Sequence, residues 1–147
     1  MGYSAPQNAT TLMTTELNAI VTAELAVGTT VFDNSTNRDA WGMAEFDFGA
    51  ALDLSAATES NPVCYLYLIP SYDGTNYADG GNASSDVVPS EYLKGIFEFN
   101  KLASSRRAVI DKFDIGPEKY TAVIFNSLGA TLSATGNTLK MSSFDRA

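Results

Sequence analysis

The sequence predicts an all-β protein, an antiparallel β-sandwich, with a jelly roll as the most favoured strand connection. Three observations support this fold class. Apolar residues recur with period two over most of the 147 residues, no segment carries a sustained apolar stripe at helical spacing, and turn-forming residues separate the apolar segments at intervals of roughly 8–15 residues. About eight strands at this spacing suit a two-sheet sandwich. The competing immunoglobulin-like sandwich lacks its Cys…Trp…Cys pattern, since the chain has one cysteine.

The chain begins with a polar, unpatterned segment, residues 1–14, for which we expect a flexible N-terminal arm. In an assembly a neighbouring subunit would hold such an arm, and in isolation it would be a loose tail. The β-sandwich domain is expected to occupy residues 15–147. Its first two strands are expected at the apolar runs 20–25 and 29–32.

The clearest strand signal lies in residues 41–54, where Phe46 and Phe48 share one parity and Glu45 and Asp47 share the other. Such alternation is typical of a strand with one face in a core and one in water. The run 63–69 alternates in the same way, with Tyr65 and Tyr67 opposite Cys64, and Pro70 is expected to end its pairing. Four more strands are expected at 93–99, 108–115, 120–126 and 138–144, and 129–134 could add a short one.

A long loop dense in Asp, Gly, Asn and Ser covers residues 71–91. Loops of this length in a small domain are usually functional or mobile. Residues 73–82 offer oxygen ligands of the kind that calcium prefers, although they lack EF-hand spacing and turn formation explains the same residues. We expect the loop to contact a partner, and the candidate contact residues are Tyr72, Asp73, Asn76, Tyr77 and Asp79.

Two further readings of aromatic and acidic residues stay open. Tyr72, Tyr77 and Trp41 could form a platform for a sugar, although Trp41 on an amphipathic strand also suits a core position. Glu45 and Asp47, two apart on one strand face, have the arrangement of a glycosidase acid pair and equally that of a solvated strand face.

Composition excludes most catalytic chemistry. The chain has no histidine and one cysteine, so the usual nucleophilic triads and His- or Cys-ligated zinc sites cannot form. Cys64 lies in an apolar run and is expected to be a buried, inert thiol. The net charge of −8 disfavours nucleic acid as a direct partner. No apolar run is long enough to span a membrane. We expect a protein that is not an enzyme and needs no cofactor or metal.

Two parts of the sequence resemble small virion structural proteins of tailed bacteriophages. The first is the stretch 67–80, with the sequence YLIPSYDGTNYADG. The second combines 120–126 with the GATL of 129–132 and the GNTLK of 136–140. The similarity spans about residues 41–144 and leaves the first forty residues uncovered.

The resemblance implies a jelly-roll capsid decoration, or cement, protein. Such a protein would bind the outside of the assembled head and stabilise contacts between subunits of the major capsid protein. It would be synthesised in the host cytoplasm, reside on the outer capsid surface of the virion, and form a homo-oligomer, a trimer rather than a dimer. The alternatives are a tail or head-fibre component of the virion and, from another functional class, a carbohydrate-binding module.

Overall fold

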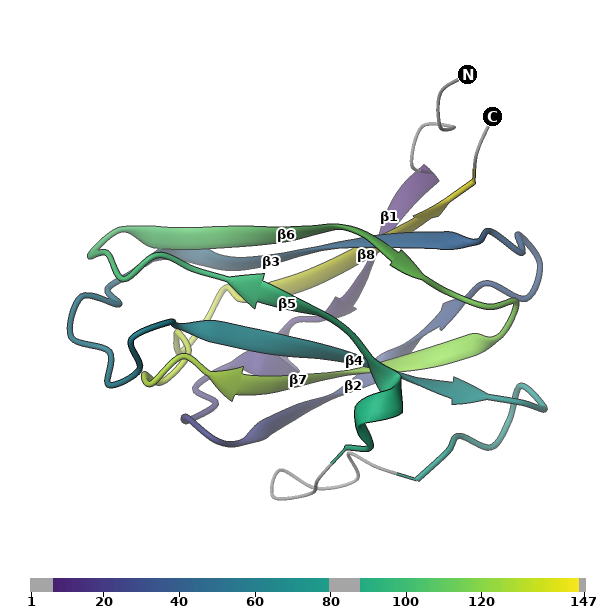
Figure 1. The fold of residues 1–147 in the computed structure, drawn as a ribbon, viewed down its shortest axis with the longest axis horizontal. Coiled ribbons are helices and arrows are strands. Elements are labelled where there is room, and N and C mark those ends of the chain that lie inside the picture. Colours follow the sequence, from purple (N-terminus) through teal and green to yellow (C-terminus); the bar gives the residue numbers. More distant parts are fainter. Residues whose placement is uncertain (1–6, 80–87, 146–147) are drawn as a thin grey trace.

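The computed structural model describes residues 7–79 and 88–145 and shows two four-stranded antiparallel sheets packed face to face (Figure 1). In spatial order, the first sheet contains β1 (Gln7–Met13), β8 (Thr138–Phe144), β3 (Trp41–Leu52) and β6 (Ser105–Asp114). The second contains β2 (Leu25–Asp33), β7 (Lys119–Ser127), β4 (Val63–Ser71) and β5 (Leu93–Glu98). Two single-turn 3-10 helices, Thr15–Leu17 and Ser90–Tyr92, lie in connections.

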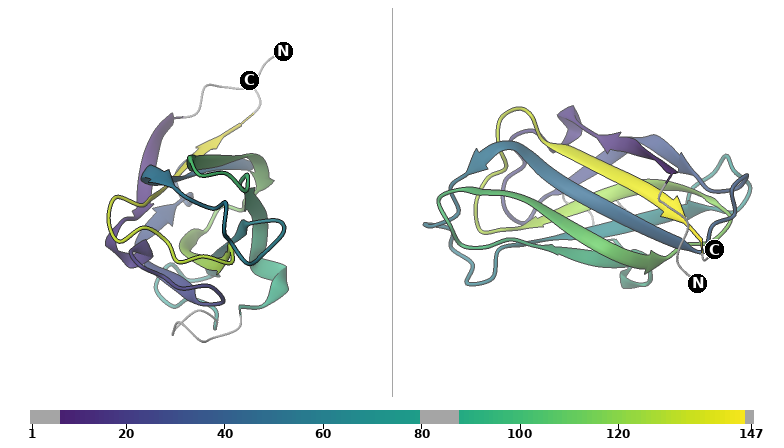
Figure 2. Two further views of the ribbon diagram at one scale, coloured as in Figure 1. Left: turned by 90° about the vertical axis from the view of Figure 1, so that its left-hand side faces the viewer. Right: turned by 90° about the horizontal axis from the view of Figure 1, so that it is seen from above.

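The connections between strands follow the jelly-roll order. Every connection except β4–β5 carries the chain from one sheet to the other, so β4 and β5 are the one consecutive pair of strands that are neighbours in a sheet. Figure 2 shows the two layers end-on and from above. Two interleaved Greek keys give this arrangement. The predicted antiparallel sandwich and its jelly-roll connection are therefore confirmed.

The core lies between the two sheets and consists of the side chains at the inward-facing alternate positions of each strand. Phe46 and Phe48 from β3 meet Phe97 and Phe99 at the end of β5, and the Phe48 and Phe99 rings stack with centroids 4.6 Å apart. Cys64 faces the same core and is fully buried. Burial of aromatic rings at this density gives a small domain enough apolar contact to fold without a disulfide or metal.

The N-terminal segment is not an arm over residues 7–13. These residues form β1, an edge strand paired with β8, with Gln7 opposite Ser143 and Thr10 opposite Met141. Leu12 and Met13 are each 1% exposed and join the core. The prediction of a flexible arm is wrong here because an edge strand needs few apolar residues when its partner supplies the hydrogen bonds. Residues 1–6 lie outside the described residues.

Three local expectations also need correction. The run 20–25 is not a strand, because Ala19 and Ala23 adopt positive φ angles of 58° and 65° and turn the chain before β2 begins. Residues 129–134 form bends rather than a strand. Pro70 does not end β4, since it still pairs with Tyr120. It is tolerated because β5 pairs with β4 only as far as Tyr67.

Candidate contact surface

The outer face of the second sheet carries a row of apolar side chains across all four strands. Ile96 on β5 lies opposite Tyr65 on β4, Tyr65 lies opposite Phe125 on β7, and Phe125 lies opposite Leu25 on β2. The Tyr65 and Phe125 ring centroids are 6.0 Å apart with their planes tilted by 45°. Because outward positions of a solvent-facing sheet are usually polar, this row is a candidate contact surface.

Part of this outer face is covered by the chain that follows β4. Tyr77 forms a bridge to Ser71, and the Ala78 N–H donates to the Pro70 carbonyl over 3.1 Å, so the segment folds back onto the sheet. As a result Ile69 and Val123 are buried although they lie outside the main core. The residues of this second apolar cluster are Leu25, Ile69, Val88 and Val123, with Val27, Tyr67, Tyr77, Ala78, Tyr92 and Phe125 packed against them.

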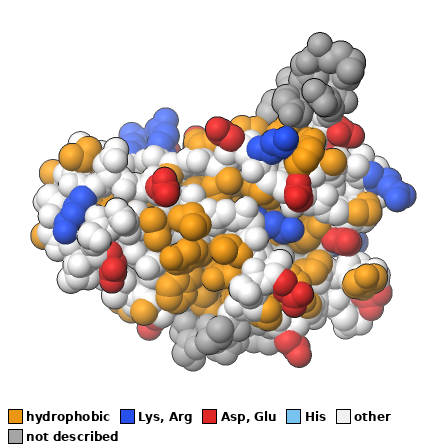
Figure 3. Space-filling view, viewed as in Figure 1, with side chains coloured by type: hydrophobic (Ala, Val, Ile, Leu, Met, Phe, Trp, Pro, Cys, Tyr) orange, Lys and Arg blue, Asp and Glu red, His pale blue; other side chains and the backbone are white. Residues whose placement is uncertain are grey.

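The remaining part of the face is open to solvent. Ile96 and Leu93 are 41% and 37% exposed, and the other members are half-buried. Figure 3 shows the corresponding gathering of apolar side chains over β4, β5 and β7. A shallow hollow of about 680 Å³ lies beside it and includes the carboxylates of Glu59 and Glu98 in its lining. We call this surface the open face, defined as Val63, Tyr65, Tyr67, Leu93, Ile96 and Phe125.

The outer face of the first sheet has the opposite character. Glu45 on β3 lies in register between Val109 on β6 and Lys140 on β8. Asp47 forms salt bridges of 3.3 Å with both Arg106 and Arg107. Alternating charges on neighbouring strands are typical of a solvated face.

The proposed acid pair of a glycosidase is not supported by this geometry. Burial raises the pKa of Asp47, but the Gly49 N–H and the guanidinium groups of Arg106 and Arg107 outweigh it and hold that pKa below its usual value. Asp47 is therefore not the proton donor of such a pair, and its two arginine contacts engage the carboxylate that the other role would need. Glu45 lies in a recess of about 250 Å³ with a mainly apolar lining.

The predicted contact loop contains a tight turn built on Asp73. The carboxylate of Asp73 accepts hydrogen bonds from the backbone N–H groups of Asn76 and Thr75, from the Asn76 amide and from the Ser71 hydroxyl. The Asn76 N–H, followed by the other donors, holds the pKa of Asp73 far below its usual range. Asp73 and Asn76 therefore shape the turn, and both remain exposed.

The other three predicted contact residues have different surroundings. Tyr77 packs against the second apolar cluster, while Tyr72 and Asp79 are exposed. Trp41 is not a core residue, because it lies on the outer parity of β3 with the Lys112 ammonium 3.7 Å from its ring centroid. Since Trp41 belongs to the first sheet and Tyr77 packs on the second, the structure does not assemble the predicted three-residue sugar platform.

Neither metal binding nor a reactive thiol is supported by the described part of the chain. Within residues 7–79 and 88–145, no group of three or more His, Cys, Asp or Glu side chains is placed to hold a metal ion. Residues 80–82 of the loop considered for calcium lie outside the described residues. Burial raises the pKa of the Cys64 thiol, so this thiol is not an activated nucleophile.

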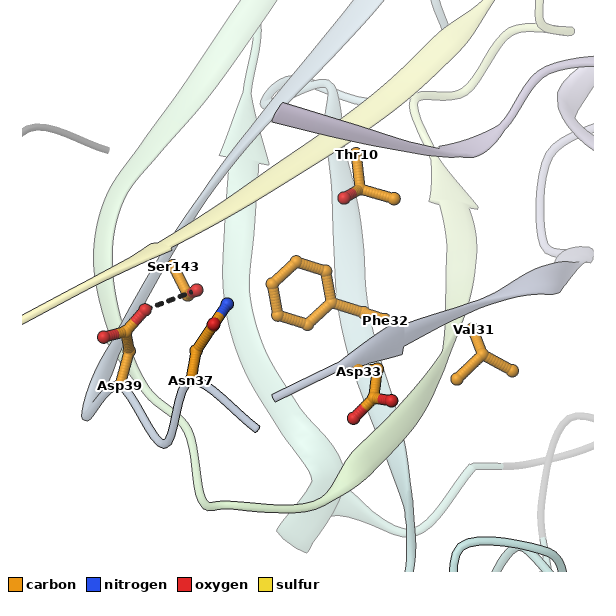
Figure 4. A pocket seen from close by; sticks show the side chains of 7 residues that line it. All are labelled: Thr10, Val31, Phe32, Asp33, Asn37, Asp39 and Ser143. Atoms are coloured by element: carbon orange, nitrogen blue, oxygen red, sulfur yellow. Dashed lines mark hydrogen bonds between the residues drawn. The ribbon is translucent and has the colours of Figure 1, made fainter. Parts of the chain in front are cut away.

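A pocket of about 610 Å³ lies where β1 and β2 border the sandwich, with Phe32 at its centre (Figure 4). Its wall is fixed by Asn34, which is fully buried and donates to the carbonyls of Asp39 and Gly116, each over 2.8 Å. The Ser143 hydroxyl donates to the Asp39 carboxylate over 2.7 Å. The pocket is mainly polar, and its lining residues are Thr10, Val31, Phe32, Asp33, Asn37, Asp39 and Ser143.

Comparison with known proteins gives one distant structural neighbour. No protein-family model and no curated protein matches the chain. Among solved structures, a family 6 carbohydrate-binding module is similar at a TM-score of 0.42 and 12% sequence identity, over 99% of this chain and 88% of that one. A likeness this distant says nothing about what the chain binds. Within the described residues, no helix is long and apolar enough to cross a membrane.

The candidate surface differs from the sequence-based one in its main residues. Tyr65 and Tyr67 were placed correctly on the face opposite Cys64, but were not recognised as part of a contact surface. Ile96 and Phe125 were missed because only the strand register brings them beside Tyr65. An aromatic residue on the solvent parity of a buried strand was the available signal.

Proposed function

We propose that this protein is a non-catalytic virion component, a decoration protein that binds the outside of an assembled phage capsid and stabilises contacts between its major capsid subunits. The sequence resemblance described above points to this class, and the jelly-roll order of the strands is the fold that the resemblance implies. The proposal includes a homo-oligomer, a trimer rather than a dimer, on the outer capsid surface.

The contrast between the two outer faces carries the proposal. One sheet presents paired charges to solvent, and the other presents aromatic and aliphatic side chains from three adjacent strands. Contiguous apolar areas on the outside of a soluble domain often mark contact with a partner. Many copies, each docked through a modest surface, would hold a shell together through avidity.

A catalytic role has little support in the described residues. Asp47 is held as a carboxylate by two arginines, and the thiol of Cys64 is buried in the core. The Asp73 carboxylate accepts hydrogen bonds within its own turn. None of these three groups is placed as a proton donor or an activated nucleophile. A contact function needs none of them.

The direct test is to mix the purified protein with capsids assembled without it and to image the particles by cryo-electron microscopy. The proposal predicts ordered added density outside the shell at symmetry-related positions. Density on the tail or on head fibres instead would identify another kind of virion component. Bare heads beside free protein would contradict the decoration role.

A carbohydrate-binding module is the second candidate, and the tilted pair of Tyr65 and Phe125 on a solvent-facing sheet favours it. Aromatic rings on a flat face stack against the apolar faces of sugar rings. Titration calorimetry with a panel of oligosaccharides tests this candidate. Micromolar binding that Phe125→Ala abolishes, with no binding to capsids, would replace the decoration role with glycan recognition.

A further inference from the structure

We propose that the open face is the docking surface, and that its partner is a protein surface with an apolar centre bordered by lysine or arginine side chains. This inference rests on the proposed function and specifies the side of the molecule and the chemistry of the partner. It replaces the loop at residues 72–77 as the main contact region.

The centre of the open face is apolar and uncharged. Tyr65 and Tyr67 lie next to each other on β4, and burial, together with the neighbouring Tyr65 phenol, raises the pKa of Tyr67. The Tyr67 phenol is therefore neutral at physiological pH. Ile96 and Leu93 add the most exposed aliphatic area. Such a centre gains by excluding water against another apolar surface.

The border of the open face is acidic beside the adjoining hollow, whereas Leu93 at the other end lines a second hollow together with Lys94 and Lys112. Glu98 lies opposite Val63 in the β5–β4 register, and both Glu98 and Glu59 line the adjoining hollow. Glu91 is exposed directly before Tyr92, which packs against the second apolar cluster. Of the described residues that line the adjoining hollow, none is lysine or arginine. Figure 3 shows both acidic and basic side chains around the apolar area.

This charge pattern selects between possible occupants. Pairing of the open face with the same face of a second copy would bring together two surfaces that each carry Glu98 and Glu59, between molecules that each have a net charge of −8. Like charges across an interface cost several kcal/mol. A partner with basic residues around an apolar centre would gain attraction at the same positions. A second copy is therefore the less favourable occupant.

Two matched pairs of variants test the assignment. Ile96→Ser removes an aliphatic side chain that is 41% exposed on the open face, and Val109→Ser removes one that is 47% exposed on the outer face of the first sheet. Glu98→Lys reverses a charge at the border, and Asp111→Lys reverses an exposed charge on β6. All four positions are exposed, so the fold should persist, and thermal melting of each variant checks this.

Binding to capsids that lack the protein is measured by co-sedimentation at several salt concentrations. We expect roughly tenfold weaker binding for Ile96→Ser. Glu98→Lys should bind roughly fivefold more weakly at low salt and lose most of the salt dependence. Val109→Ser and Asp111→Lys should bind like the wild-type protein. Sedimentation velocity of the free protein should give the same oligomeric state for wild type and Ile96→Ser.

The possible contrary results separate the two proposals. No binding by the wild-type protein overturns both the decoration role and the docking surface. Wild-type binding that Ile96→Ser and Glu98→Lys leave unchanged overturns the docking surface alone. An oligomer that Ile96→Ser dissociates would assign the face to a second copy, and glycan binding lost in Ile96→Ser would assign it to a sugar; either result overturns the protein partner.

Discussion

Tyr65 on β4 and Phe125 on β7 lie in register on the outer face of the second sheet, with ring centroids 6.0 Å apart and planes at 45°. Neither ring belongs to the inter-sheet core, where Cys64 and Leu66 occupy the alternate positions of β4. The pair therefore stabilises an outward surface and keeps two large side chains in fixed positions there. A preformed surface loses less side-chain entropy when it binds.

The first prediction concerns the energy of this pair. A double-mutant cycle with Tyr65→Ala, Phe125→Ala and the double variant should give a coupling of about 1 kcal/mol in the free energy of unfolding, the range found for adjacent aromatic pairs. Urea denaturation provides the measurement. Tyr65→Ala combined with Val109→Ala is the control cycle, and it should be additive because Val109 lies on the other sheet. A coupling near zero for the aromatic pair would contradict the packing.

The second prediction compares two glycines with the same backbone conformation. Gly49 and Gly74 have φ angles of +79° and +78°. A Cβ at Gly49 would overlap the carbonyl oxygen of Gly136, whereas at Gly74 the nearest atoms belong to the Lys119 side chain at 3.8 Å. Gly74→Ala should cost about 1 kcal/mol for the left-handed conformation alone, and Gly49→Ala about 3 kcal/mol or more. Equal costs in chemical denaturation would show that the Gly49 turn can relax.

The third prediction concerns the buried amide that fixes the β2–β3 connection. Asn34 donates to two backbone carbonyls and accepts from the Asp39 N–H over 3.1 Å. Asn34→Ala leaves these groups without partners and should lower the free energy of unfolding by about 3 kcal/mol. Asn37→Ala changes an exposed amide in the same connection and should be nearly neutral. Similar melting temperatures for both variants would rule out this role for Asn34.

The fourth prediction is a pH dependence. The pKa of Asp47 is lowered in the folded protein relative to about 3.9 in the unfolded chain. Its contribution to stability is therefore present above about pH 4 and is lost as the pH falls through the folded value. Asp47→Asn should cost about 1 kcal/mol at pH 7 and flatten the loss of stability below pH 4.

Denaturant unfolding of wild type and Asp47→Asn between pH 7 and pH 2 measures this effect. Glu45→Gln changes a carboxylate on the same strand face, and within the described residues Glu45 forms no salt bridge. Its profile should follow the wild type. If the free energy of unfolding of wild type and Asp47→Asn changed with pH in the same way, the two arginine contacts would not contribute to the pH dependence of stability.

The fifth prediction concerns the thiol. Cys64 is fully buried, and burial raises its pKa. A thiol reagent such as Ellman's reagent should therefore not label the native protein at pH 8, and should label one thiol per chain in denaturant. Rapid labelling of the native protein would place Cys64 at a mobile or accessible position.

Much of the fold could be predicted because alternation survives wherever a strand has one buried face. Phe46 and Phe48 marked β3 in this way, and Cys64 and Leu66 marked β4. The strand β1 could not be found from pattern, since Gln7–Met13 is largely polar and its partner lies about 130 residues away in sequence. Positive φ angles at Ala19 and Ala23 leave no composition signal, because alanine is not a turn-forming residue.

The contact surface was less predictable for a related reason. Parity along β4 showed that Tyr65 and Tyr67 face away from the core, but only the pairing of β4 with β5 and β7 places Ile96 and Phe125 beside them. The loop after β4 was selected for its composition. The Asp73 carboxylate accepts hydrogen bonds from the N–H groups two and three residues later and so stabilises the turn. An Asp at the start of a turn-forming segment is the sequence signal for this role.

The pairing of Gln7 with Ser143 has a practical consequence. The described chain enters and leaves the sandwich at one corner of the first sheet, while the open face belongs to the outer side of the second sheet. A foreign domain fused to either terminus would therefore start from the layer that does not dock. If the open face lies against a shell, every bound copy would project such cargo outward, and the protein would serve as a scaffold for displaying antigens or enzymes at regular spacing.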